Sequence, residues 1–205
     1  IRTSILQQTA MPKFGQRYGG ADLNDYDVLI LPDGGRGLRQ LFQEEQLAQL
    51  KAWVQAGGVL IANESAAGFF TKGQSKFTNV EVRETAQDTS ETAKYLPYAE
   101  RRDYYGKKRI PGSALNAWLD TTHPLAFGMD EQLYALKFGD TAMEPSSGLQ
   151  TVGYYEKDVD QLMVAGYASE ENLQHLAGGS FAGVVGMGSG KVVFLADNTQ
   201  YRMFW

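Results

Sequence analysis

The chain has 205 residues, of which 43% are hydrophobic and 21% charged, and this predicts a single globular domain over residues 1–205. Its net charge of −5 argues against nucleic-acid binding, because phosphate recognition depends on clustered excess Lys and Arg. The absence of cysteine excludes disulfides, thiolate metal sites and thiol catalysis, and no apolar run approaches the roughly 20 residues that span a bilayer. Because the chain starts at Ile1 without a signal-peptide pattern, we expect it to be a piece of a longer protein.

The first third of the chain predicts a parallel strand–helix–strand unit. Residues 26–32 form a short apolar run that ends in a tight loop. Apolar side chains then recur at helical spacing over residues 38–54, a glycine pair stops the helix, and a second apolar run follows at residues 59–62. Because both runs are continuously apolar, we expect interior strands of a sheet that is covered on both faces.

The rest of the chain predicts further strands around a polar insertion. The segment 88–109 is interrupted by Pro97 and Gly106, which favours an extended surface insertion. Ser169 can cap a short helix that runs to Leu176. Short strands are expected at residues 79–83, 114–120, 132–138, 161–167, 181–187 and 191–196.

Residues 57–70 are the most informative stretch, because a buried strand leads directly into small residues that open a helix. This is the pattern of a nucleophile elbow, a tight turn that presents a catalytic Cys or Ser and directs amide hydrogens toward an oxyanion. The tip of the turn reads Asn63-Glu64-Ser65. The sequence therefore predicts the architecture of a catalytic turn without the cysteine that such a turn often carries.

Residues 101–109 mix basic and aromatic side chains, as nucleic-acid surfaces can. Glu100 and Asp103 dilute the positive charge, and the chain as a whole is acidic. We therefore interpret the segment as a solvated loop or as a patch that docks on another domain.

The strand at residues 26–32, the helix after it and the elbow together resemble the class I glutamine amidotransferase-like fold. Later segments are similar to the amidotransferase-like domain that is C-terminal to bacterial zinc carboxypeptidases of the carboxypeptidase A type. The resemblance implies an α/β, flavodoxin-like, three-layer fold with a mostly parallel sheet and helices on both faces. It covers residues 26–205, and the later segments are residues 110–113, 119–128, 163–167, 176–178 and 190–202.

The resemblance implies a noncatalytic accessory domain whose parent protein is a zinc metallocarboxypeptidase. The upstream catalytic domain of the same chain would then be its partner, and a periplasmic or secreted location is implied because such carboxypeptidases are commonly exported. The parent's zinc ligands, a His-x-x-Glu pair and a distant His, have no counterpart here, because Ala126 stands three residues after His123. We therefore expect no metal and no other cofactor in this domain, and zinc only in the parent's catalytic domain.

The amidotransferase pattern places Asn63 where the nucleophilic cysteine would be. The late strand that should precede the catalytic histidine ends in Asp197-Asn198 instead, so no inherited amidotransferase activity is expected. An alternative is a serine hydrolase in which Ser65 is the nucleophile and His123 or His175 is the base. The simpler interpretation is that Ser65 caps the following helix, His123 is structural and His175 faces solvent.

Glu64 has two interpretations. Its carboxylate can accept hydrogen bonds from the first helical amides and benefit from the helix dipole, which is a structural role. Together with Asp33, whose loop should lie at the same edge of the sheet, it can instead shape an acidic pocket. The sequence therefore leaves open a small-molecule or glycan-binding module with Asp33 and Glu64 as ligand-binding residues.

Overall fold

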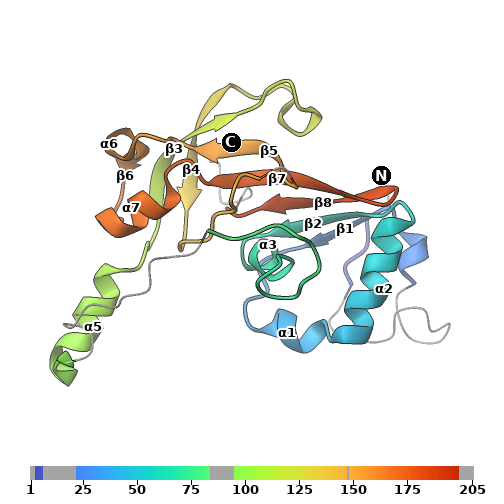
Figure 1. Cartoon of the computed structure of the whole chain (residues 1–205), viewed down its shortest axis with the longest axis horizontal. Coiled ribbons are helices and arrows are strands. Elements are labelled where there is room, and N and C mark those ends of the chain that lie inside the picture. Colours follow the sequence, from blue (N-terminus) through green and yellow to red (C-terminus); the bar gives the residue numbers. More distant parts are fainter. Residues whose placement is uncertain (1–2, 7–21, 84–94, 147, 199–205) are drawn as a thin grey trace.

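One mixed sheet organises the protein in this computed structural model, which describes residues 3–6, 22–83, 95–146 and 148–198. The strands are β1 (Val28–Leu31), β2 (Val59–Asn63), β3 (Ser113–Leu119), β4 (Gln132–Lys137), β5 (Gln150–Tyr155), β6 (Met163–Ala165), β7 (Ser180–Met187) and β8 (Gly190–Leu195). The helices are η2 (Leu23–Asp25), α1 (Gly37–Leu41), α2 (Glu44–Gln55), α3 (Ser65–Phe69), α5 (Tyr98–Lys107), η3 (Pro124–Ala126), α6 (Val159–Leu162) and α7 (Glu170–Leu176). Figure 1 shows their arrangement.

The order of the strands across the sheet is β1-β2-β8-β7-β5-β3-β4, and β6 pairs with β3. Only β1, β2 and β8 are parallel, whereas every other pairing is antiparallel. The expectation of a mostly parallel sheet is therefore wrong. The tight turn between Met187 and Gly190 forces β7 and β8 to be antiparallel, since a parallel pair needs a crossover of a dozen or more residues.

The predicted strand–helix–strand unit is confirmed as β1–α2–β2, with Val28 paired to Val59 and Leu31 to Ala62. The helix expected over residues 38–54 is divided into α1 and α2, because the chain leaves the helical conformation at Phe42 and Gln43. The helix ends where the glycine pair was expected to stop it. A Cβ atom at Gly58 would lie 2.5 Å from the ring of Trp53, so the close packing of this indole requires a glycine there.

The first strand is exposed on one face, which differs from the expectation of an interior strand covered on both faces. Leu29 and Leu31 are buried, but Val28 is 46% exposed and Ile30 54% exposed. Within the described part of the chain, β1 is the edge of the sheet and pairs with β2 alone. The contacts of α2 with β8 and of α3 with β2 lie further into the sheet and do not cover this outer face of β1.

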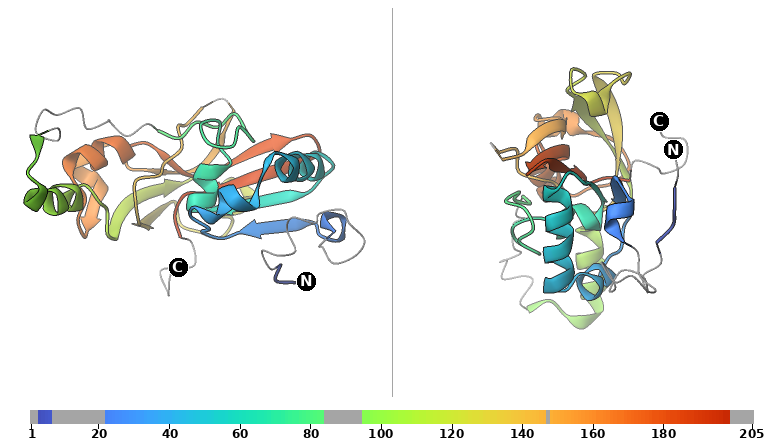
Figure 2. Two further views of the ribbon diagram at one scale, coloured as in Figure 1. Left: turned by 90° about the horizontal axis from the view of Figure 1, so that it is seen from below. Right: turned by 90° about the vertical axis from the view of Figure 1, so that its right-hand side faces the viewer.

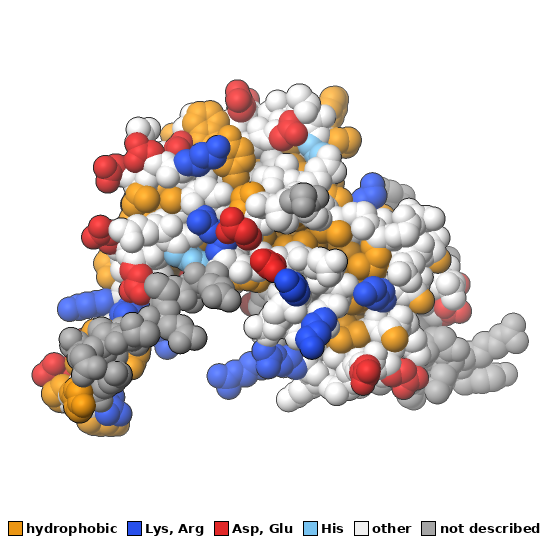
Figure 3. Space-filling view, viewed as in Figure 1, with side chains coloured by type: hydrophobic (Ala, Val, Ile, Leu, Met, Phe, Trp, Pro, Cys, Tyr) orange, Lys and Arg blue, Asp and Glu red, His pale blue; other side chains and the backbone are white. Residues whose placement is uncertain are grey.

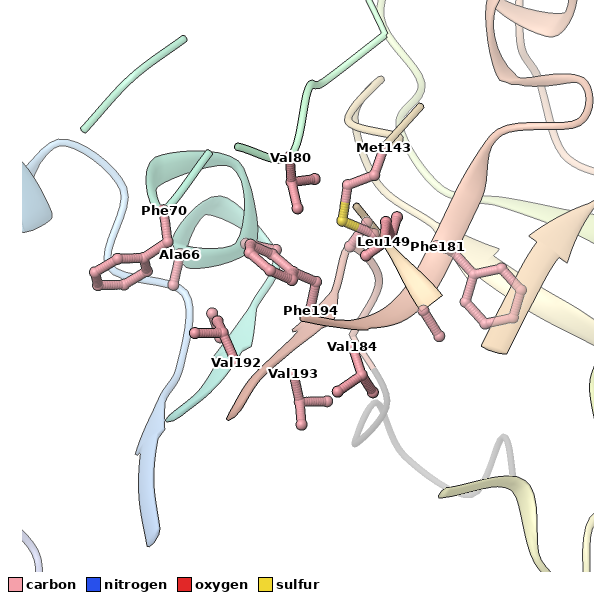
Figure 4. Packing of buried hydrophobic residues seen from close by; sticks show 14 of the residues in the cluster. Ala66, Phe70, Val80, Met143, Leu149, Phe181, Val184, Val192, Val193 and Phe194 are labelled. Carbon is pink, nitrogen blue, oxygen red and sulfur yellow. The ribbon is translucent and has the colours of Figure 1, made fainter. Parts of the chain in front are cut away.

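An aromatic cluster holds α3 against the sheet. The rings of Phe69 and Phe70 meet edge to face with their centroids 5.0 Å apart, and Phe77 meets Phe70 at the same distance. Figure 4 shows Phe70 and other buried side chains beside Val192 and Phe194 of β8. This packing fixes the position of the turn between β2 and α3.

The polar segment that was expected to be an extended insertion contains α5. Pro97 is at the N-cap position of α5 and not inside the helix. At the start of a helix its missing amide hydrogen costs nothing, because the first amides have no partner within the helix. Gly106 lies in the last turn of α5. Figures 1 and 2 show α5 projecting away from the sheet, and residues 88–94 of the expected insertion lie outside the described residues.

Two other predicted elements also differ. The strand expected at residues 79–83 is only an isolated bridge between Val82 and Met143. The strand expected at residues 161–167 is the end of α6 followed by β6, because the carboxylate of Asp158 accepts a hydrogen bond from the amide of Asp160 and starts a helix. β5 was not predicted. None of the helices among the described residues is long and apolar enough to cross a membrane.

Candidate functional site

The turn between β2 and α3 has the backbone geometry of a nucleophile elbow. Glu64 lies at its tip with φ 50° and ψ −118°, a conformation that side-chain-bearing residues rarely adopt. Its amide donates a hydrogen bond of 2.7 Å to the carbonyl of Leu195, which ties the turn to the end of β8. Glu64, and not Asn63, therefore stands at the tip of the elbow, because Asn63 is still the last residue of β2.

The hydroxyl of Ser65 binds the loop that follows β1. Its oxygen accepts hydrogen bonds from the amides of Gly34 at 3.2 Å and Gly35 at 2.9 Å, and it donates to a carboxylate oxygen of Asp33. Neither Ser65 nor Glu64 caps α3, since no side chain at the start of this helix accepts a hydrogen bond from its amides. Ser65 instead fixes the loop of Asp33 beside the elbow, and the structural role expected for each residue as a helix cap is wrong.

The predicted pair Asp33 and Glu64 do lie together, and the end of β8 adds a third carboxylate, Asp197. Burial is the largest cause that raises the pKa of Glu64, and repulsion from Asp33 and then from Asp197 raises it further. A hydrogen bond with Asn198 and the charge of Lys137 act in the opposite direction. The elbow therefore has a half-buried carboxyl group that holds its proton more tightly than an exposed glutamate does.

Next to this cluster is a buried network of polar side chains that was not predicted from the sequence. The ammonium group of Lys137 is fully buried and lies 2.8 Å from Asp197, and it also donates to the carbonyl of Thr141. The hydroxyl of Tyr155 donates to the other oxygen of Asp197 at 2.6 Å. Burial, followed by the charge of Asp197, raises the pKa of Tyr155 well above its ordinary value.

Strand direction explains why these residues meet. The carboxyl ends of β2, β4, β5 and β8 share one edge of the sheet, and Lys137 and Tyr155 are the last residues of β4 and β5. A sequence signal for the network was present, because Lys137 is in phase with Leu133 and Ala135 on alternate positions of the strand. A lysine on the inward face of a strand indicates a buried partner.

His123 lies at the opposite edge of the sheet from Ser65. It follows the carboxyl end of β3, and β3 runs antiparallel to β2, so His123 and the elbow lie at opposite ends of the strands. Its Nδ1 accepts a hydrogen bond of 3.1 Å from the amide of Leu125. The structure therefore does not bring His123 and Ser65 together.

His175 is half-buried on α7, and it is not the solvent-facing residue that was expected. Its Nε2 lies 2.9 Å from the carbonyl oxygen of Asp140. The hydrogen bonds of the Ser65 hydroxyl are all with the loop after β1. Neither histidine is placed to accept its proton.

A cavity of about 690 Å³ lies along the exposed face of β1, between residues 3–6 and the start of α1. Gly34 lines it, but Asp33 and Glu64 do not. This cavity is thus beside the carboxylate cluster rather than over it. Among the residues that the structure describes, no group of three or more His, Asp or Glu side chains is arranged to hold a metal ion.

No protein-family model and no curated protein sequence matches this chain. Solved structures match it in fold. A cytoplasmic protein from Salmonella typhimurium LT2 is similar with a TM-score of 0.50 and 12% identity, over 96% of this chain and 68% of that protein. A ThuA-like protein from Parabacteroides merdae is similar with a TM-score of 0.51 and 12% identity, over 86% of this chain and 61% of that protein.

A β-galactosidase from Bacillus circulans sp. alkalophilus is similar with a TM-score of 0.47 and 13% identity, over 86% of this chain. The chain spans only 21% of the β-galactosidase and 61% of the ThuA-like protein. At such identities the likeness shows the fold alone. The chain has an α/β fold with a mixed sheet, and the ThuA-like protein shares it.

Proposed function

We propose that this chain is a noncatalytic domain with a glutamine amidotransferase-like fold, which serves as an accessory module of a longer protein. The β1–α2–β2 crossover, the elbow after β2 and the similarity to a ThuA-like protein support the fold. The observation that carries the noncatalytic part is the set of hydrogen bonds of Ser65. Its hydroxyl is occupied by the loop after β1 and has no imidazole beside it.

The chemistry of this hydroxyl is that of a structural group. A serine nucleophile needs a base to take its proton and a free lone pair to attack. Here two amides donate to the oxygen, which withdraws electron density from it, and the proton is directed at a carboxylate. The elbow tip itself presents Glu64, which cannot replace a thiol in acyl transfer.

The identity of the longer protein rests on the sequence resemblance. The motifs of residues 110–202 support a zinc metallocarboxypeptidase as the parent, with its catalytic domain upstream and exported with it. The names of the similar solved structures add no support for this parent. Sequencing the gene upstream of the codon for Ile1 tests it, since an upstream domain with a His-x-x-Glu pair is expected and an unrelated domain would refute it.

Activity measurements on the purified chain test the noncatalytic assignment. The expected result is no turnover of p-nitrophenyl acetate or glutamine above buffer and no labelling by a fluorophosphonate probe, for the wild type and for Ser65→Ala alike. Labelling at Ser65, or a turnover that Ser65→Ala abolishes, would establish the serine hydrolase alternative instead.

A second candidate function is the binding of a small cationic ligand or an amino sugar at the carboxylates of the elbow. The raised pKa of Glu64 favours it, because a ligand cation would relieve the repulsion between Glu64 and Asp33. In thermal-shift measurements, polyamines and amino sugars are expected to raise the melting temperature of the wild type but not that of Glu64→Gln. Equal shifts for both proteins would contradict it.

A further inference from the structure

A projecting segment, residues 95–109, combines exposed aromatic and basic side chains, and we call it the arm. Its helix α5 contains no buried residue, although an isolated ten-residue helix is marginal in water. Tyr95 is 80% exposed and Tyr98 89% exposed. The arm has a net charge of +3, because it has two acids, Glu100 and Asp103, against five bases, Arg101, Arg102, Lys107, Lys108 and Arg109.

A second segment, residues 120–131, has the opposite charge, and we call it the tip. It joins β3 to β4 and contains Asp120, Asp130 and Glu131 but no Lys or Arg, so its net charge is −3. It also exposes apolar surface, with Phe127 88% exposed and Leu125 about half exposed. Figure 3 shows the basic side chains of the arm and the acidic side chains of the upper part of the molecule on one face.

The arm and the tip lie at the two ends of one hairpin. The arm precedes Ser113 at the start of β3, and the tip follows Leu119 at its end. Seven residues of a strand span roughly 20 Å, so the two segments point away from each other in one copy, as Figure 1 shows. An arm and a tip can therefore satisfy each other only between copies.

The strand beside them is open. Within the described residues β4 pairs with β3 and with no other strand, so one row of its backbone groups faces outward. Tyr134, in the middle of β4, is 58% exposed. Such an edge is a template for pairing with another strand.

We propose that two copies of this chain associate about a two-fold axis through their β4 edges, so that the arm of each copy packs on the tip of the other. A two-fold axis perpendicular to the sheet makes the two β4 strands antiparallel, which places each arm beside the partner's tip. The contact is then isologous and closes as a dimer. In each of its two arm–tip contacts an arm of net charge +3, whose Lys108 also pairs with Glu171 of its own copy at 3.4 Å, faces a tip of net charge −3. The arm also supplies Tyr and Arg, which are enriched in interfaces.

Sedimentation velocity and light scattering on the full chain at low salt test the proposal. The expected mass is twice the 22.6 kDa of one chain, and it falls toward one chain as salt rises. In the arm variant, Arg101→Glu with Arg102→Glu, and in the tip variant, Asp130→Lys with Glu131→Lys, like charges face each other. Each variant alone is expected to weaken dimerisation by at least about tenfold.

Mixing the two variants gives the sharpest result. In the mixed dimer, the acidic arm of one chain meets the basic tip of the other, and the unchanged arm meets the unchanged tip, so two monomeric variants are expected to form a heterodimer. Arg36→Glu with Lys191→Glu is the control, because it changes the charge of two exposed positions outside both segments and should leave the dimer intact.

Three outcomes would overturn the proposal. The wild type could remain a monomer up to about 100 µM, a concentration at which a micromolar interface is saturated. The dimer could survive in both charge variants, or the mixed variants could stay monomeric. If the wild type stayed a monomer and bound duplex DNA through the arm, the dimer would likewise be refuted. Detection of hydrolysis by the chain would refute the proposed noncatalytic function but would leave these three tests of the dimer unchanged.

Discussion

The buried ion pair between Lys137 and Asp197 offers the most direct test of the network beside the elbow. Replacing Lys137 with Met keeps the length of the side chain and removes its ammonium group. Asp197 is almost fully buried, and among the described residues it then retains the hydroxyl of Tyr155 as the one hydrogen-bond donor to its carboxylate. The perturbation therefore leaves a buried carboxylate without its counter-charge.

The size of the effect follows from the burial of both partners. Breaking a buried ion pair by removing one partner costs about 3–5 kcal/mol, because the remaining charge is left uncompensated. The hydrogen bond from Tyr155 persists, so we expect the lower end, about 3 kcal/mol. For a chain of 205 residues, at about 2–4 °C for each kcal/mol, the midpoint of thermal unfolding should fall by about 6–12 °C.

Urea and thermal unfolding, followed by circular dichroism, measure this change. The triple variant Lys137→Met, Asp197→Leu and Tyr155→Phe should recover most of the loss, because an apolar replacement of a buried network removes its desolvation cost. The matched control is Lys72→Met, since Lys72 pairs with Glu81 on the exposed surface and should show no measurable change. If Lys137→Met unfolded at the same urea concentration as the wild type, the reasoning would be refuted.

Three further predictions concern the elbow and the β8 hairpin. The pKa of Glu64 is raised above 4.5, so the folded chain binds this proton more tightly than the unfolded chain, and the stability of the wild type falls as the pH rises above 4.5. Glu64→Gln, which mimics the protonated side chain, should therefore melt at a higher temperature than the wild type at pH 7. In thermal scans this difference should fade as the pH falls below 4.5. Ser65→Ala should lower the free energy of unfolding by about 1 kcal/mol in urea titrations, because the loop after β1 loses its hydrogen bonds, and an unchanged midpoint would contradict the structural role. Gly190→Ala should destabilise the chain strongly in the same assay, since a Cβ atom would lie 2.1 Å from the carbonyl oxygen of Val54, whereas Gly186→Ala, with nothing within 4 Å, is the control and should cost far less.

The candidate site was only partly predictable. The sequence placed Asp33, Glu64 and Ser65 at one edge of the sheet, because the carboxyl ends of parallel strands meet there. It placed Asn63 at the position of the nucleophile, one residue before the actual tip at Glu64, because a shift of the turn by one residue leaves the apolar pattern unchanged. The contacts of Ser65 with a loop 30 residues away could not be predicted, because they depend on how the loop after β1 folds back.

The sequence by itself determined the local elements whose signals lie within a dozen residues. The apolar period and a glycine pair predict β1–α2–β2, apolar runs predict β7 and β8, and Ser169 predicts the start of α7. Only the tertiary structure decided the order of the strands, the burial of Lys137 against a carboxylate 60 residues away and the projection of α5 from the body. The physical reason is that periodicity shows which face of an element is apolar but not which distant element covers it.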